Sequence, residues 1–203
     1  MSNAIRVALL SLGLVASVSS LAVAQELKGE ALFAALKQGG YVIYLRHAAS
    51  DAAQNDIEPV DFGNCATQRN LSEEGRVQAK SIGKAFGSLG IAADKVLSSP
   101  YCRTKETAML AFGAAETVEP LRYSDAMPEN AQAAIIDQLK RLLAAAPMAG
   151  KNTVMVGHSS NMKAAAGTWP RTEGGAVVLQ PKSDGGFAVV GSFTAAELIK
   201  AGT

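Results

Sequence analysis

The chain has 203 residues, of which 48% are hydrophobic and 18% are charged, and its formal net charge is +1 at pH 7. This length suits one domain with a full-sized hydrophobic core. Because Lys and Arg residues form no basic run, neither a nucleic acid nor an acidic membrane surface is expected as a partner.

The N-terminal segment has the features of an export signal. Arg6 precedes an apolar run, and the run ends in Ala22-Val23-Ala24, the small-residue pattern that signal peptidase recognises. The alternative is a membrane anchor, but several serines and a glycine interrupt a run that is short for a span of about 20 apolar residues. We expect a signal peptide over residues 1–24 and a single domain over 25–203. The mature protein would be periplasmic or secreted, without stable membrane insertion.

The first half of the mature chain alternates between helical and strand patterns. Residues 26–40 predict a helix that ends at two glycines, and the β-branched and aromatic residues 41–45 predict a strand. Residues 46–70 are polar and irregular, and a loop of this length in a compact domain is usually functional. Ser72 then caps a helix whose apolar residues recur at helical spacing.

The alternation continues to the C-terminus. Further strands are expected at 95–99, 117–121, 152–157, 176–181 and 186–191. Further helices are expected at 101–113, around 135–146, from about 159, and at 194–202. Strands that alternate with helices predict a layered α/β domain with a mostly parallel sheet and helices on both faces.

In such sheets, ligands bind beyond the carboxyl ends of the strands. Three pairs of residues are expected at this edge: Arg46 and His47, Ser98 and Ser99, and Gly157 and His158.

The chain has only two histidines, and both lie at predicted strand ends. A neutral imidazole is a nucleophile that needs no strong base to activate it. Arg46 adjoins His47, and Arg103 begins a predicted helix, so two guanidiniums are available to bind phosphate oxygens. Phosphoryl transfer depends mainly on positioning and charge stabilisation, which these residues supply.

Four segments together resemble the histidine phosphatase superfamily, which includes phosphoglycerate mutases and histidine acid phosphatases. They are "YLRHAAS", "LSEEGRVQAKSIGKAF", "VLSSPYCRTKETA" and "VMVGHSS", and the resemblance runs from about residue 41 to 160. It implies a phosphoglycerate mutase-like fold in which His47 becomes phosphorylated. It further implies a phosphate pocket formed by Arg46, Arg103 and His158, with Ser50 adding a hydrogen bond.

The sequence departs from the family pattern in two ways. Ala48 replaces the usual glycine after the histidine, and its methyl group is expected to narrow the space beside the backbone at the pocket. Ser159 and Tyr123 stand where two branches of the family place a general acid. The remaining candidates for the general acid are Asp51, Asp56, Asp125 and Glu173.

The two cysteines, Cys65 and Cys102, permit one disulfide in an oxidising compartment, and two separate thiols are the alternative. The sequence has no cluster of cysteines and histidines of the zinc-binding type, so neither a metal nor another cofactor is expected.

The sequence therefore predicts an exported phosphomonoesterase that acts through a phosphohistidine on His47. Its ligand would be a small phosphorylated substrate or inorganic phosphate. A phosphomutase is one alternative, although a glycolytic mutase has no evident role outside the cytoplasm. A catalytically weak phosphate-binding module is the other, because no standard general acid is in place.

Overall fold

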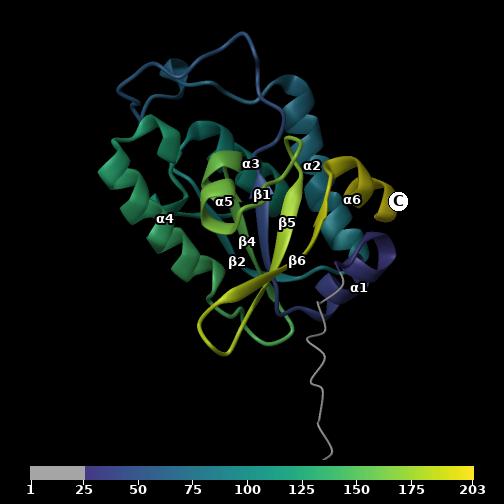
Figure 1. The fold of residues 1–203 in the computed structure, drawn as a ribbon. Helices are drawn as coiled ribbons and strands as arrows, with labels where there is room; N and C mark the ends of the chain where they lie inside the picture. Colours follow the sequence, from purple (N-terminus) through teal and green to yellow (C-terminus); the bar gives the residue numbers. More distant parts are fainter. Residues whose placement is uncertain (1–25) are drawn as a thin grey trace, which may run out of the picture.

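The computed structural model of the chain describes residues 26–203 and contains a single six-stranded sheet (Figure 1). The strands are β1 (Val42–Arg46), β2 (Ala93–Ser98), β3 (Glu116–Thr117), β4 (Asn152–Gly157), β5 (Ala176–Pro181) and β6 (Phe187–Phe193). They lie in the order β3-β2-β4-β1-β5-β6. The pairs β3–β2, β2–β4 and β4–β1 are parallel, whereas β5 is antiparallel to both β1 and β6. The predicted, mostly parallel sheet is confirmed.

Helices cover both faces of the sheet, as the sequence predicts (Figure 1). They are α1 (Gly29–Gln38), α2 (Glu73–Leu89), α3 (Cys102–Phe112), α4 (Glu129–Leu143), α5 (Ser159–Ala166) and α6 (Ala195–Ala201). Apolar residues of α1, α2, α3 and α6 pack on one face, and those of α4 and α5 pack on the other. Three short 3-10 helices, η1 (Cys65–Thr67), η2 (Glu119–Leu121) and η3 (Ser124–Ala126), lie in connecting segments.

Strand β1 shows how the sequence builds both halves of the core. Successive side chains of a strand point to opposite faces of the sheet. Ile43 and Leu45 accordingly pack with α1 and α2, whereas Val42 and Tyr44 pack on the side of α4. All four side chains are fully buried, and burying one such aliphatic side chain contributes about 2 kcal/mol.

Local signals fix where the main helices begin and end. The Ser72 hydroxyl accepts the Gly75 N–H at 3.1 Å, which satisfies one free donor at the start of α2. Gly90 ends that helix in the left-handed conformation, with φ of 68°. Thr194 and Glu197 form a reciprocal capping box at the start of α6.

Two predicted elements differ from the structure. The strand expected at 117–121 is confined to Glu116–Thr117, because the chain turns into η2 at Pro120, which cannot donate to a strand ladder. Helix α4 ends at Leu143 and does not reach Ala146. Pro147 disfavours the helical conformation of the residue before it, which explains the earlier end.

Within residues 26–203, no helix is long and apolar enough to cross a membrane. The expected signal peptide over 1–24 and its cleavage site lie outside the residues that the structure describes.

Candidate active site

A cavity of about 340 Å³ lies at the carboxyl ends of the central parallel strands. Strands β1 and β4 end beside it, and helices α3 and α5 begin around it. The long loop between β1 and α2, drawn in blue beyond the end of the sheet in Figure 1, contributes another part of the wall. The lining residues are Arg46, His47, Asn55, Asp56, Arg69, Arg103, Tyr123, His158, Ser159 and Ser160. His47 and the three residues expected to form the phosphate pocket, Arg46, Arg103 and His158, are therefore neighbours in space.

His47 follows β1 and is held by its backbone on two sides. Its N–H donates to the Gly157 carbonyl at 3.2 Å, and its own carbonyl accepts the Gly174 N–H at 2.9 Å. The ring atom Nδ1 lies 2.9 Å from the Ala48 carbonyl oxygen, which can only accept, so Nδ1 carries the proton. The Nε2 lone pair is then free to act as a nucleophile at the cavity.

The surroundings of His47 keep the imidazole neutral. Burial lowers the pKa of His47 from its ordinary 6.5 to about 3, and the bond to the Ala48 carbonyl opposes this shift. The nearby guanidiniums of Arg103, Arg46 and Arg69 lower the pKa further, because they repel a positive ring. A neutral ring is the form that phosphoryl transfer to nitrogen requires.

Arg69 is a third cation of the cavity that the sequence prediction missed. It lies at the end of the long loop, and its Nη2 is 3.9 Å from Oε1 of Glu173. Arg46 Nη2 donates to the same oxygen at 3.3 Å. Ser50 donates from its hydroxyl at 2.7 Å and from its N–H at 3.2 Å to the Glu173 carboxylate. Ser50 therefore fixes Glu173 and is not among the residues that line the cavity.

Arg103 is the most deeply buried of these cations, with a side chain that is 3% exposed. Its Nη1 donates to both carboxylate oxygens of Asp56, at 3.0 and 3.1 Å. Its Nε is buried and has no hydrogen-bond partner among the described residues. Because Asp56 and Arg103 both line the cavity, an incoming anion would compete with Asp56 for the guanidinium.

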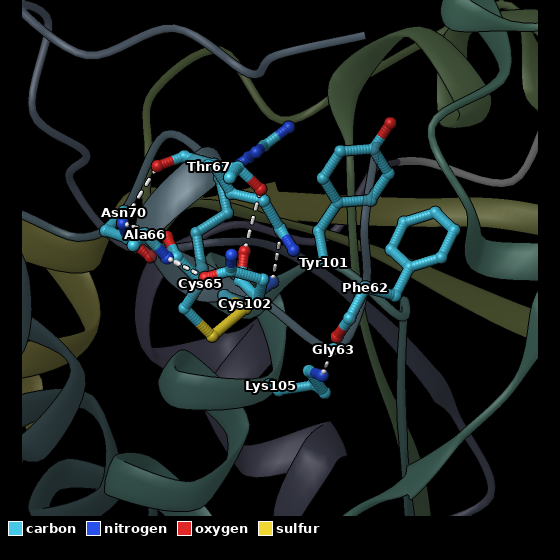
Figure 2. The surroundings of a disulfide bond; sticks show 12 residues. Phe62, Gly63, Cys65, Ala66, Thr67, Asn70, Tyr101, Cys102 and Lys105 are labelled. Carbon is cyan, nitrogen blue, oxygen red and sulfur yellow. Dashed lines mark hydrogen bonds between the residues drawn. A yellow bond between two sulfur atoms is a disulfide. The ribbon is translucent and has the colours of Figure 1, made fainter. Parts of the chain in front are cut away.

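A disulfide attaches the long loop to the helix that carries Arg103 (Figure 2). Cys65 lies in η1, and Cys102 is the first residue of α3, directly before Arg103. Beside the bridge, the Cys102 N–H donates to Gln68 Oε1 at 2.9 Å, and the Lys105 ammonium donates to the Phe62 carbonyl at 3.2 Å. The bridge thus holds the segment that supplies Asp56 and Arg69 against α3.

His158 follows β4 and is fixed by Tyr44. The Tyr44 hydroxyl donates to the His158 carbonyl at 3.0 Å and accepts the His158 N–H at 3.1 Å. Gly157 makes this possible, because a Cβ there would lie 2.3 Å from the Tyr44 oxygen. The ring atom Nε2 of His158 lies 2.9 Å from the hydroxyl oxygen of Ser99. Burial lowers the pKa of His158 well below 6.5, so this ring is also neutral.

The four carboxylates predicted as candidates for the general acid occupy different places. Asp56 lines the cavity as the acceptor of Arg103, and Glu173 lies behind Arg46 as the acceptor of Ser50. Asp51 accepts the Ala53 N–H, Asp125 accepts from the Ser124 hydroxyl at 3.5 Å, and neither lines the cavity. Asp56 is therefore the one member of this group in the cavity wall.

The structure also locates Ala48 and Ser159, at which the sequence departs from the superfamily pattern that it resembles. Ala48 is fully buried and packs with Leu71 and Ala79, so its methyl group does not narrow the cavity as expected. Ser159 and Ser160 line the cavity at the start of α5, where no side chain caps the helix. The hydroxyl oxygen of Ser160 is buried and has no partner within the described part of the chain.

Within residues 26–203, no group of three or more potential metal-ligating side chains is close enough to hold a metal ion.

Comparison with known proteins agrees with this geometry. The model of the histidine phosphatase superfamily (branch 1) matches residues 42–133. The mitochondrial serine/threonine-protein phosphatase Pgam5 of Drosophila persimilis is 38% identical over 72 residues, which is 36% of this chain. That match covers 22% of the Pgam5 chain, so only about a fifth of the relative is represented here.

Two solved structures share the fold. The protein histidine phosphatase SixA, complexed with tungstate, has a TM-score of 0.51 at 16% identity, covering 78% of this chain and 99% of its own. The phosphoserine phosphatase of Entamoeba histolytica, in complex with 3-phosphoglyceric acid, has a TM-score of 0.54 at 14% identity, covering 78% of this chain and 98% of its own. The expected phosphoglycerate mutase-like architecture is thus present.

Proposed function

We propose that this chain, for which the family model and the structural neighbours support the histidine phosphatase superfamily, hydrolyses phosphomonoesters through a phosphohistidine on His47. The observation that carries the proposal is the position of His47. Its Nδ1 is bonded to a carbonyl, which leaves Nε2 free in a cavity that three arginines also line. A neutral nucleophile among fixed positive charges suits a dianionic phosphoryl group.

In the first step, the Nε2 lone pair of His47 attacks phosphorus. The bond between phosphorus and the leaving oxygen breaks, and that oxygen keeps the electron pair and takes a proton from solvent or from an acid. Arg46, Arg69 and Arg103 stabilise the charge on the phosphoryl oxygens. In the second step, a water oxygen attacks phosphorus, the N–P bond breaks, and its electron pair returns to Nε2. The products are an alcohol and inorganic phosphate.

The leaving group is expected to influence the rate strongly. Asp56 and Glu173 both accept hydrogen bonds from arginines. A carboxylate that accepts from a guanidinium is poorly suited to donate a proton to the leaving oxygen. We therefore expect faster hydrolysis of aryl phosphates than of alkyl phosphates, since a good leaving group needs little help from an acid.

Substitution of His47 tests the proposal. His47→Gln keeps a polar side chain of similar size, removes the nucleophile, and should reduce p-nitrophenyl phosphate hydrolysis to background. Arg141→Gln, on the exposed outer side of α4, is the matched surface control and should retain full activity. Circular dichroism would show whether both variants fold. A folded His47→Gln protein with wild-type turnover would refute the proposal.

A phosphate-binding module without turnover is the second candidate, and the same contacts favour it, because Asp56 and Glu173 are already engaged as acceptors of arginine hydrogen bonds. This module would bind inorganic phosphate yet release none from any phosphomonoester. A phosphomutase would instead transfer the group to a second hydroxyl of its substrate. Measuring inorganic phosphate and isomerised substrate in one reaction distinguishes the three activities.

We further propose that the protein is exported and acts in the periplasm or outside the cell, on a small phosphorylated substrate. The signal-like segment 1–24 supports export, and so does the disulfide, because such bonds persist mainly in oxidising compartments. N-terminal sequencing of the protein from the producing cells should give Gln25 as the first residue. A membrane-bound chain that retains residues 1–24 would instead indicate an anchor.

A further inference from the structure

We infer that Ser99 is a positioning residue that holds the His158 ring in the tautomer with its proton on Nδ1. In this tautomer the ring presents an N–H to the cavity, where it can donate to a phosphoryl oxygen. The inference rests on the proposed function for its consequence, but the proton position itself can be measured without any activity.

The backbone of Ser99 is fixed on several sides. The Ser99 N–H donates to the Val156 carbonyl at 3.0 Å, which ties the residue to β4 directly before the segment that carries His158. The Ser99 carbonyl accepts the hydroxyls of Thr104 and Ser98, both at 2.9 Å. Ser99 is fully buried. Its hydroxyl is therefore held at one place relative to the His158 ring.

The available partners decide where the protons lie. The Ser99 oxygen lies 3.5 Å from the Tyr101 N–H, which can only donate, and 2.9 Å from His158 Nε2. Among the described residues, Nε2 is thus the acceptor that remains for the Ser99 hydroxyl proton. Because Nε2 accepts this proton, the ring proton of neutral His158 must lie on Nδ1.

The second ring nitrogen, Nδ1, is left for an anion in the cavity. His158 lines the cavity, and its Nδ1 has no hydrogen-bond partner in residues 26–203. The backbone of His158 is held by Tyr44, and the rings of Tyr101 and Tyr123 lie against the imidazole, with centroids 5.0 and 5.2 Å away. These contacts restrict rotation of the ring, so Nδ1 stays directed at the cavity.

The tautomer matters because the ring is uncharged. Burial and the neighbouring guanidinium of Arg103 keep His158 neutral, so it cannot attract phosphate as a cation. A neutral imidazole with its proton on Nε2 would direct a lone pair at the phosphoryl oxygens and repel them. With its proton on Nδ1, the same ring donates a hydrogen bond to the anion.

Nitrogen NMR tests the proton position directly. The chain has two imidazoles, and the spectrum of His47→Gln assigns His158 without ambiguity. We expect a protonated Nδ1 and an unprotonated Nε2 for His158 in the wild-type protein, and a shift of the proton toward Nε2 in Ser99→Ala. Ser81→Ala is the matched control, because its hydroxyl donates to the Val77 carbonyl within α2, which supplies no residue of the cavity wall, and it should give the wild-type spectrum.

Binding of inorganic phosphate, measured by calorimetry, tests the consequence. Ser99→Ala should weaken binding and lower kcat/KM by about tenfold, the effect of one hydrogen bond of about 1.4 kcal/mol. Ser81→Ala should change neither. A wild-type His158 with its proton on Nε2 would overturn the inference even if the phosphatase activity is present. A Ser99→Ala protein with the altered tautomer and unchanged phosphate affinity would overturn the role in binding. A wild-type protein that shows the inferred tautomer but hydrolyses no phosphomonoester would refute the proposed function and leave the inference about Ser99 intact.

Discussion

Removal of the disulfide should destabilise the protein strongly. Cys65 and Cys102 are 37 positions apart, so the bond closes a long loop in the unfolded chain. For a loop of this length, the chain-entropy relation gives a stabilisation of about 4 kcal/mol. In a domain of this size, that free energy corresponds to a decrease of about 10 °C in Tm. We expect this decrease in Cys65→Ser/Cys102→Ser and, equally, in wild-type protein treated with a reductant.

Loss of the disulfide should reduce the activity only moderately, although Cys102 is the residue next to Arg103. The hydrogen bonds of Cys102 to Gln68 and of Lys105 to Phe62 still hold the loop after the bond is broken. Small displacements of Asp56 and Arg69 should nevertheless reduce kcat/KM by about tenfold. Thermal unfolding and p-nitrophenyl phosphate hydrolysis, each with and without reductant, measure both effects. The double variant should not respond to reductant, and a wild-type protein whose Tm does not change on reduction would refute the reasoning.

Three other changes should have distinct results. Asp56→Asn leaves the buried Arg103 cation without its carboxylate and should lower the free energy of unfolding by about 3 kcal/mol. In a thermal scan, added phosphate should raise the Tm of this variant more than that of the wild-type protein. Because the pKa of His47 is about 3, kcat/KM should not fall as the pH passes through 6.5. The free energy of unfolding should be highest above pH 6.5 and should decrease toward pH 3, since the unfolded chain takes up a proton there and the folded one does not. Profiles of rate and Tm against pH check this, and a rate loss centred at pH 6.5 would contradict it. Gly157→Ala should destabilise by about 2 kcal/mol, since its Cβ would meet the Tyr44 hydroxyl, and denaturant unfolding of Gly157→Ala/Tyr44→Phe should show partial recovery.

Much of the fold follows from local patterns in the sequence. The β-branched run before Arg46 and the apolar run before Gly157 predict two buried strands, and these strands are parallel neighbours in register, with Arg46 opposite Gly157. Because parallel strands end at the same edge, two histidines far apart in sequence meet there, with ring centroids 5.7 Å apart. The sequence could therefore place both imidazoles in one site.

The rest of the site depends on contacts that no local pattern encodes. Arg69 lies in a polar loop without periodicity, and nothing in its neighbourhood distinguishes it from a solvated cation. Glu173 reaches Arg46 across 127 positions, and only the packing of its loop brings the two side chains together. Ser99 could be placed at the edge of the sheet from the sequence, but its contact with His158 depends on the register of β2 and β4.

The central claim is that His47 carries the phosphoryl group, and trapping of the intermediate tests it most directly. Enzyme mixed with labelled substrate and quenched within one turnover should carry one acid-labile, base-stable phosphoryl group per chain. Peptide mapping should place this group on His47, and it should be absent from His47→Gln. Turnover by the wild-type enzyme without a trapped phosphohistidine, or with the label on His158 or any other residue, would contradict the account.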